Sequence, residues 1–172
     1  METAQDALFH IEQKGSLCPA NADGSACNNM KRYLTSSPQE TESLAQSLAE
    51  LLRPGDVIAF RGGMGAGKTA FVRGLARGLD CPGQVSSPTF SLVHEYGGRI
   101  PLCHFDMYRI STLEDLCSTG YFDYLEAGCI LAVEGSEHIQ DALENPLCIT
   151  IQQPEGPGSS QREITIEGGG RF

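Results

Sequence analysis

Hydrophobic residues recur along this chain with two different periods, and the period indicates where helices and strands are expected. A helix is predicted from Pro38 to about Leu52, because its leucines fall on one face that can pack against a sheet: Leu44, Leu48, Leu51 and Leu52. Ser37 to Glu40 supplies the start of this helix, since it combines a capping box with proline at the first helical position. The apolar run Val57–Phe60 predicts a buried strand, and a second helix is expected from Lys68 to Leu79.

The second half of the chain carries shorter apolar segments that are typical of strands. Phe90–Tyr96 and Ile100–Met107 flank the turn at Gly97 and Gly98, so they predict a β-hairpin. Further strands are expected at Arg32–Thr35, Cys129–Val133, Leu147–Gln152 and Arg162–Glu167, with short helices at 112–116 and 121–125. This order predicts a three-layer α/β domain with a largely parallel central sheet and antiparallel edge strands.

The length of 172 residues suits one compact domain, which we expect over residues 30–168. Residues 1–29 show no sustained apolar period and are rich in loop-forming residues, so they predict a disordered extension. Met30 is an alternative start of the chain. Residues 169–172 are expected to be a short tail.

Charge and cysteine content narrow the classes of function. Twelve Lys and Arg residues against 22 Asp and Glu residues give a net charge of −10, which disfavours direct binding of a nucleic acid. The seven cysteines are odd in number and form no C-x-x-C pair, so they indicate reduced, buried thiols rather than a disulfide framework or a zinc site. No apolar run is long enough to span a membrane and no signal peptide is recognisable, so a cytoplasmic protein is expected.

The segment Gly62–Thr69 matches the phosphate-binding pattern G-x-x-x-x-G-K-[ST] in full. Its glycines let backbone N–H groups turn toward phosphate oxygens, and the following helix adds a partial positive charge there. Lys68 is expected to reach the β- and γ-phosphates, and the Thr69 hydroxyl is expected to bind Mg²⁺. A glycine-rich turn without a ligand is the alternative. The predicted nucleotide contacts are Gly63, Met64, Gly65, Ala66, Gly67, Lys68, Thr69 and Ala70.

Two carboxylates at the ends of predicted strands could complete such a site. Glu134 ends the run Cys129–Val133, where an acidic residue is expected to hold Mg²⁺, although an acid that begins a helix is the alternative. Asp106 ends the strand that contains His104, and it is a candidate for orienting or deprotonating a water molecule. A cap or a salt bridge to Arg109 is the alternative for Asp106. Thr89 lies where switch loops occur, but Ser-Pro-Thr alone is also a simple turn.

Five segments follow one another in a specific order: Gly65–Thr69, Phe71–Leu75, Ser87–Tyr96, His104–Arg109 and Val133–Glu134. Together they resemble the TsaE family, the bacterial P-loop ATPases of tRNA threonylcarbamoyladenosine biosynthesis. The resemblance extends from about Arg32 to Glu167, and it is more specific than the phosphate loop alone because it rests on several motifs.

This resemblance implies an ATPase that associates with a TsaB–TsaD heterodimer and supports threonylcarbamoyl transfer without catalysing it. tRNA would then be reached only indirectly, through the complex. Matching positions imply that Lys68, Asp106 and Glu134 act in catalysis, and that Thr69 and Glu134 bind Mg²⁺. They also imply that Thr89 belongs to a switch loop and that Thr41 lies near the nucleotide.

Two features depart from the family pattern. A tryptophan usually follows the acid that corresponds to Glu134, whereas Gly135 stands there and the chain contains no tryptophan. The extension over residues 1–29 matches nothing in the family.

Other nucleotide-binding classes fit the sequence less well. A GTPase requires an Asn-Lys-x-Asp motif for its base, and none is present. A small-molecule kinase shares the phosphate loop but usually carries an arginine-rich lid, while only Arg162 and Arg171 follow Arg109. An ATP-binding assembly module with little hydrolysis is the remaining alternative.

Overall fold

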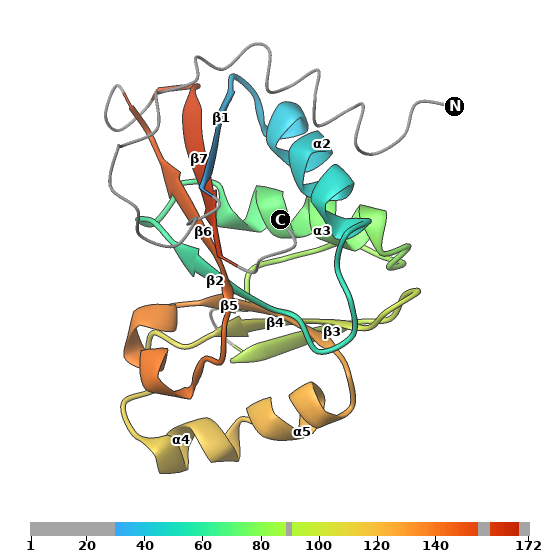
Figure 1. Ribbon diagram of the computed structural model, residues 1–172, viewed down its shortest axis with the longest axis vertical. Helices are drawn as coiled ribbons and strands as arrows, with labels where there is room; N and C mark the ends of the chain where they lie inside the picture. The colour runs from blue at the N-terminus through green and yellow to red at the C-terminus, as the bar shows by residue number, and fades with distance from the viewer. Residues whose placement is uncertain (1–29, 89–90, 155–158, 169–172) are drawn as a thin grey trace, which may run out of the picture.

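The computed structural model describes residues 30–88, 91–154 and 159–168, which form a seven-stranded sheet between two helical layers (Figure 1). The strands are β1 (Lys31–Thr35), β2 (Val57–Arg61), β3 (Val93–Tyr96), β4 (Leu102–Asp106), β5 (Ile130–Glu134), β6 (Leu147–Gln152) and β7 (Arg162–Glu167). The helices are α2 (Pro38–Ala49), α3 (Lys68–Gly78), α4 (Leu113–Ser118) and α5 (Tyr121–Glu126), with short 3₁₀ helices η1 (Ser136–His138) and η2 (Gln140–Ala142).

The sheet has a parallel centre and antiparallel edges, in the order β1-β7-β6-β2-β5-β4-β3. Strands β6, β2, β5 and β4 run parallel to one another, whereas β1 with β7, β7 with β6, and β3 with β4 pair in the antiparallel sense. The three-layer α/β fold that the sequence predicts is therefore confirmed. The carboxyl ends of the four parallel strands all meet at one edge of the sheet.

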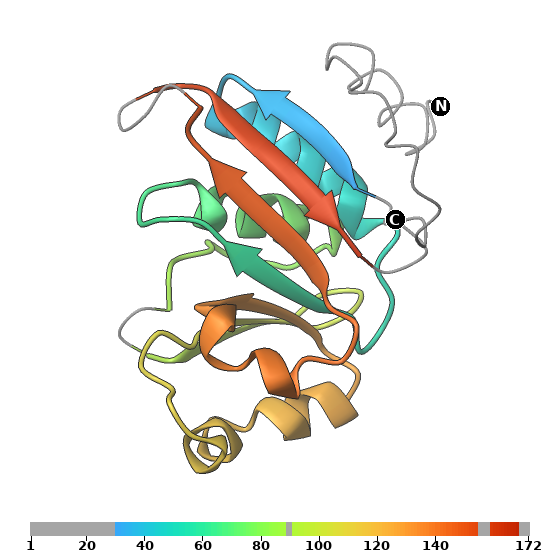
Figure 2. The same cartoon turned by 60° about the vertical axis from the view of Figure 1, so that its left-hand side comes forward.

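Each face of the sheet is covered by its own helices and has its own apolar core (Figure 2). Residues of α2 and α3 pack with Leu102 and Ile130 on one face, while Phe105 and Tyr121 belong to the core under α4 and α5. Because side chains alternate along a strand, His104 on β4 points to the same side as Leu102. The polar ends of β4 and β5 therefore face the layer that holds the phosphate loop.

Helices α2 and α3 approach closely because glycines of α3 face alanines of α2. A Cβ atom at Gly74 would lie 2.6 Å from the Cβ of Ala45, and one at Gly78 would lie 2.6 Å from the Cβ of Ala49. The two glycines fix the distance between the helices, and thereby the position of α3 under the sheet.

Helix α2 starts with Ser37 as its cap and proline at its beginning, as expected, but Glu40 bonds one residue before the cap, so the predicted capping box does not close, and the end of the helix differs as well. The Ser37 hydroxyl accepts a hydrogen bond from the backbone N–H of Glu40 at 3.2 Å, and the Glu40 carboxylate accepts from the N–H of Ser36 at 2.8 Å. The helix ends at Ala49 instead of near Leu52. Leu51, predicted on the packing face, is 37% exposed as a result, whereas Leu52 is buried in the turn that follows.

The predicted hairpin forms, with shorter strands. β3 begins at Val93, because Ser91 and Leu92 belong to a turn in which both N–H groups donate to the carbonyl of Pro88. Leu92 has a φ of +67°, which a regular strand does not allow. Phe90, the predicted first residue of this strand, lies outside the described residues, as do the predicted extension over 1–29 and the tail over 169–172.

No helix in the described part of the chain has the length and apolar character needed to cross a lipid bilayer.

Candidate functional site

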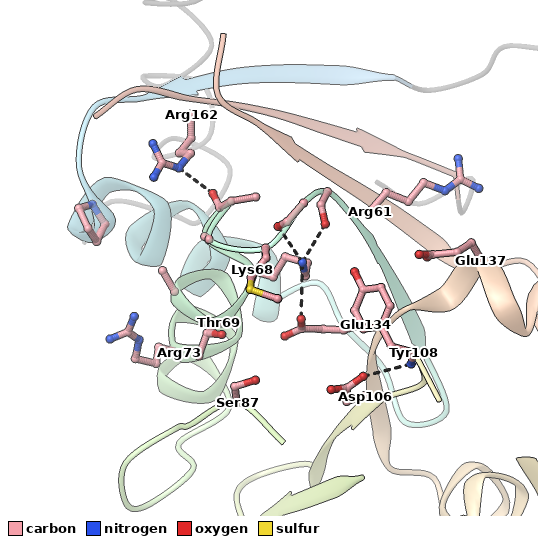
Figure 3. A pocket seen from close by; sticks show the side chains of 18 of the residues that line it. Arg61, Lys68, Thr69, Arg73, Ser87, Asp106, Tyr108, Glu134, Glu137 and Arg162 are labelled. Carbon is pink, nitrogen blue, oxygen red and sulfur yellow. Dashed lines mark hydrogen bonds and ion pairs between the residues drawn. The ribbon is translucent and has the colours of Figure 1, made fainter. Parts of the chain in front are cut away.

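A cavity of about 1190 Å³ opens at the carboxyl ends of the parallel strands (Figure 3). The whole segment from Arg61 to Ala70 lines it, including the loop between β2 and α3. Asp106 and Glu134 reach it from the ends of β4 and β5, and Arg162 reaches it from β7. Parallel α/β sheets bind ligands at this edge, so the cavity is where a ligand is expected.

The loop between β2 and α3 requires glycine for its backbone path. Gly62, Gly65 and Gly67 have φ values of +139°, +74° and +115°, in the region that residues with a side chain rarely adopt. Gly67 immediately precedes the first helical residue, Lys68, so the amino end of α3 points into the cavity. Its free N–H groups favour an anion at this place.

Lys68 is nearly buried, with an exposure of 7%, and its ammonium group is fully engaged (Figure 3). Nζ donates to the carbonyl oxygens of Gly62 at 2.8 Å and Gly63 at 3.0 Å, and lies 3.6 Å from Oε2 of Glu134. The centre of the Tyr108 ring lies 5.9 Å from Nζ, so the face of this aromatic ring also lies beside the positive charge. The lysine therefore bridges the loop and the end of β5.

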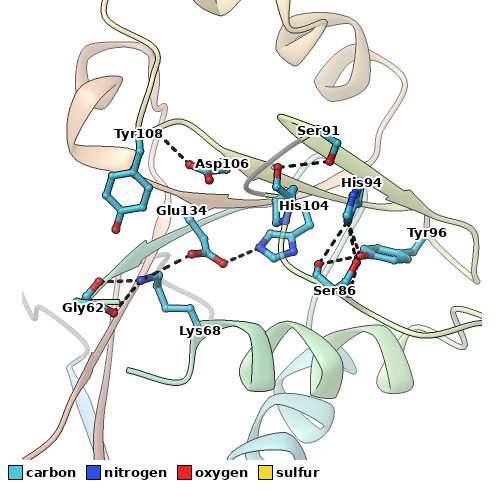
Figure 4. Close-up of polar contacts among 12 residues, drawn as sticks. Gly62, Lys68, Ser86, Ser91, His94, Tyr96, His104, Asp106, Tyr108 and Glu134 are labelled. Carbon is cyan, nitrogen blue, oxygen red and sulfur yellow. Dashed lines mark hydrogen bonds and ion pairs between the residues drawn. The ribbon is translucent and has the colours of Figure 1, made fainter. Parts of the chain in front are cut away.

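Each oxygen of the Glu134 carboxylate has a different partner (Figure 4). Oε2 faces Lys68, while Oε1 lies 2.9 Å from Nε2 of His104, a residue of β4 with no exposed surface. A carboxylate oxygen is an acceptor, so Nε2 of His104 carries the proton and donates it. From the sequence, His104 could line the site as a second polar residue but was interpreted as a core histidine outside the catalytic set, and this contact behind Glu134 was not predicted.

Asp106 and Glu134 are neighbours in the register of β4 and β5, so their carboxylates emerge side by side. Asp106 Oδ1 accepts the backbone N–H of Tyr108 at 3.1 Å, which is the capping role considered as an alternative from the sequence. Asp106 nevertheless lines the cavity, at an exposure of only 6%. The structure therefore allows the capping bond and a role toward a ligand together.

The cavity concentrates positive charge in a chain of net charge −10. Five of the twelve Lys and Arg residues line it, against three acids: Arg61, Lys68, Arg73, Arg109 and Arg162 with Asp106, Glu134 and Glu137. Such a local excess of cations attracts a polyanion of small size. The cavity is thus electrostatically suited to a phosphorylated ligand.

Arg162 joins the last strand of the sheet to the phosphate loop. Its Nε donates to the carbonyl of Ala66 at 2.6 Å, and its Nη1 donates to the carbonyl of Gln161 at 2.9 Å and to that of Ser159. The bond from Nε joins Arg162 to a residue 96 positions earlier in the sequence. It ties the backbone of the loop to a strand on the far side of β6.

Ten of the predicted site residues line the cavity: the eight from Gly63 to Ala70, Asp106 and Glu134. Thr41 does not line it. The Thr41 side chain is buried at the start of α2, where its hydroxyl lies 2.8 Å from that of Thr35. Thr89 lies outside the described residues, although Ser87 of the same segment lines the cavity.

Arg162 and Tyr108 also line the cavity, and sequence reasoning did not assign them to it. Arg162 begins β7 on the same face as the buried Ile164 and Ile166, so an arginine in that apolar row was a usable signal. Tyr108 follows Asp106 by two residues, and no pattern in the sequence indicates that its ring faces Lys68.

The cavity contains side-chain oxygen atoms of the kind that bind a hard divalent cation. Thr69 contributes a hydroxyl to the cavity that Asp106 and Glu134 also line. Within the described ranges there is no group of three or more His, Cys, Asp and Glu side chains that could hold a metal ion by itself. Mg²⁺ fits this environment, because it commonly binds through one or two protein oxygens, ligand phosphates and water.

Comparisons with known proteins agree on one family. A family model described as threonylcarbamoyl adenosine biosynthesis protein TsaE matches residues 35–164. A TsaE protein of Bacillus subtilis is 38% identical over 138 residues, covering 78% of this chain and 84% of the relative. One from Aquifex aeolicus is 40% identical over 140 residues and covers 80% of this chain and 96% of the relative.

A solved structure is similar over most of its length. The crystal structure of YdiB from Bacillus subtilis superposes with a TM-score of 0.70 at 32% sequence identity, covering 86% of this chain and 92% of YdiB.

Proposed function

Because this chain belongs to the TsaE family of tRNA threonylcarbamoyladenosine biosynthesis, we propose that it is the component that binds and hydrolyses ATP. The observation that carries the proposal is the environment of Lys68. Its ammonium group lies in the wall of a cationic cavity, at the start of α3, between the carbonyl oxygens of the loop and Glu134. This is the arrangement that binding of a triphosphate requires.

Binding of ATP exchanges the partners of Lys68. The ammonium group leaves the carbonyl oxygens of Gly62 and Gly63 and moves to the β- and γ-phosphates, which are better charge partners than neutral carbonyls. The N–H groups of the loop and of the start of α3 bind the remaining phosphate oxygens. The arginines that line the cavity add positive charge that can stabilise the charge that develops on the γ-phosphate.

Asp106 is the residue we assign to the attacking water. Its Oδ1 is fixed by the N–H of Tyr108, so the carboxylate has a defined orientation at the cavity wall. A fixed carboxylate can accept a hydrogen bond from water and later its proton, which accelerates attack on the γ-phosphorus.

Thr69 and Glu134 are the residues that we assign to Mg²⁺, together with phosphate oxygens of the nucleotide. The ion, when bound, neutralises charge on the phosphates and orients them for in-line attack. Glu134 is suited to this role because its Oε2 faces the ammonium group of Lys68, which moves to the phosphates when ATP binds.

We further propose that the protein acts with a TsaB–TsaD heterodimer and contacts tRNA only through that complex. The net charge of −10 supports the second part, since most of the surface repels a polyanion. Five of the twelve Lys and Arg residues line the cavity, which leaves seven for the rest of the chain.

A small-molecule kinase remains the second candidate, because the structure removes one argument against it. The sequence contains no arginine-rich lid, yet Arg61, Arg73, Arg109 and Arg162 all reach the cavity. Such a set can screen a phosphoryl group in transfer as well as in hydrolysis.

Titration calorimetry and phosphate release test the proposal together. We expect saturable ATP binding in Mg²⁺, slow phosphate release, an increase in rate with TsaB–TsaD and no phosphorylated metabolite. Lys68→Ala should abolish binding, whereas Lys31→Ala, a lysine of β1 outside the cavity, should leave it unchanged.

Each contrary result points to one alternative. A phosphorylated metabolite identifies a kinase, and tight ATP binding without turnover even with the partners identifies an assembly module. Folded protein that takes up no ATP contradicts all three.

A further inference from the structure

Behind the cavity, the buried His104 contacts the carboxylate of Glu134, which also faces Lys68 (Figure 4). His104 does not line the cavity and has no exposed surface, so it cannot touch a nucleotide directly. Among the described residues, its side chain makes one hydrogen bond, to Oε1 of Glu134 at 2.9 Å. Any effect of His104 on a ligand must therefore pass through Glu134.

The other ring nitrogen of His104 is in an unfavourable position. Nδ1 is buried and has no hydrogen-bond partner among the described residues. A buried polar atom without a partner costs roughly 1–3 kcal/mol. An apolar residue at position 104 would avoid this cost, and it would suit a face of the sheet that also carries Leu102 and Ile130. The single bond from Nε2 is the contact that accounts for a histidine here.

The bond from His104 makes the two oxygens of Glu134 inequivalent. A free carboxylate can turn about its last bond and present either oxygen, or both, to a cation. With Oε1 held by a side chain that is itself fixed in the sheet, Oε2 is the oxygen that faces Lys68. When Lys68 moves to the phosphates, Oε2 keeps its direction instead of following the ammonium group.

We propose that His104 is a positioning residue, which donates from Nε2 to Glu134 and holds Oε2 in the direction required for the divalent cation of the ATP complex. This inference rests on the proposed function, because it assigns a role toward the cation at the same site. It is a separate claim, since ATP could bind and be hydrolysed with Glu134 unaided. Partners of metal ligands commonly change metal affinity or activity 10- to 100-fold when removed.

Two amide variants test the position of the donor with matched chemistry. His104→Gln places an amide nitrogen near the site of Nε2, whereas His104→Asn places it near the site of Nδ1, too short to reach Glu134. We measure ATP affinity by calorimetry over a Mg²⁺ series and in chelator. The expected result is that His104→Asn raises the Mg²⁺ concentration for half-maximal enhancement of ATP binding about tenfold or more, and that His104→Gln restores it to within about threefold.

Affinity in chelator separates positioning from a structural role. We expect both variants to bind ATP in chelator as the unmodified protein does. If His104→Asn keeps the original Mg²⁺ requirement, or loses affinity equally with and without Mg²⁺, the proposal is wrong.

A measurement on the unmodified protein keeps the test independent of variant folding. Nitrogen NMR of its histidine side chains, with His104 assigned from the His104→Gln spectrum, reports which ring nitrogen carries the proton. Protonation at Nε2 with a bare Nδ1 supports the proposal, and a proton on Nδ1 alone overturns it. This readout requires no ATP, so failure of the proposed ATPase function and failure of the His104 assignment give different results.

Discussion

Asp106 and Glu134 are adjacent in register, yet their partners predict different consequences of mutation. Asp106 accepts a hydrogen bond from the N–H of Tyr108, whereas Glu134 is the acid that pairs with Lys68, so removal of Asp106 should spare the phosphate loop. We expect Asp106→Ala and Asp106→Asn to retain ATP affinity and to lower phosphate release about 100-fold or more. The side-chain oxygen of the asparagine variant can still accept the hydrogen bond from the N–H of Tyr108. This variant therefore tests the role of the carboxylate in hydrolysis while the turn is kept. Unchanged turnover would exclude Asp106 from the mechanism.

Gly135 is the residue at which this chain departs from the family pattern, and its surroundings explain what glycine allows. It has a φ of +68°, and a Cβ atom there would lie 2.7 Å from the backbone nitrogen of Tyr108. A tryptophan at this position therefore requires a different path of the chain beside Met107 and Tyr108.

Replacing Gly135 should destabilise the protein. We expect Gly135→Ala to lower the free energy of unfolding by about 2 kcal/mol, because the left-handed conformation and the close approach both disfavour a side chain. Gly97→Ala is the control, since Gly97 has no positive φ and open space at its Cβ. Urea unfolding measures both, and equal stabilities would contradict this explanation.

At the scale of elements, Arg162 connects strand β7 to the phosphate loop. Its bond to the carbonyl of Ala66 holds the loop from the opposite side to Lys68. The guanidinium group also bonds to Gln161 and Ser159, which fixes its own position. The hairpin of β6 and β7 and the loop between β2 and α3 are therefore expected to respond to one another.

Removing this arginine should weaken binding without unfolding the sheet. We expect Arg162→Ala to lower ATP affinity about tenfold, because a loop that loses a charge-assisted hydrogen bond must be ordered by the ligand. Glu163→Ala, which changes the next residue on the opposite face of β7, should have little effect. Equal affinities of the two variants in calorimetry would show that Arg162 does not order the loop.

At the scale of the whole molecule, burial of thiols makes stability depend on alkaline pH. Burial, with a smaller contribution from Asp80, raises the pKa of Cys81 from 9.0 to about 11. Burial also raises the pKa of Cys103 and of Cys148. In the unfolded chain a thiol ionises at its ordinary pKa, so the unfolded state loses protons first as pH rises.

Protein stability should therefore decrease at alkaline pH. The contribution of Cys81 is fully present below about pH 9 and is lost as pH rises toward 11, so the free energy of unfolding should fall over that interval. Urea unfolding at a series of pH values measures it. Cys81→Ser should reduce this dependence, and Cys117→Ser, which removes an exposed thiol, should not. A stability that stays constant across the interval in the unmodified protein would contradict the argument.

Local features were predicted well where the determinants are close in sequence. The phosphate loop is contiguous, and its glycines, lysine and threonine are all within eight positions. Asp106 and Glu134 were found because each ends an apolar run, and parallel strands bring their ends to one edge. The end of α2 was misjudged because Leu51 and Leu52 continue the helical period, although only Leu52 is buried.

The contacts that sequence reasoning missed depend on strand order. Arg162 reaches Ala66 because β7 lies two strands from β2, on the far side of β6, and His104 reaches Glu134 because β4 lies next to β5. The spacing of residues along the sequence does not indicate either of these two contacts. The role of Thr41 and that of Thr89 stay predictions.

The sequence by itself determined the elements, the three-layer α/β class and the phosphate loop, because local conformational preference and periodic burial act over a few residues. Only the tertiary structure decided which charges meet: Lys68 with Glu134, Glu134 with His104, and Arg162 with Ala66. These pairs are set by strand order and by the direction of each side chain on the sheet, and both result from burial of the whole core rather than from any one segment.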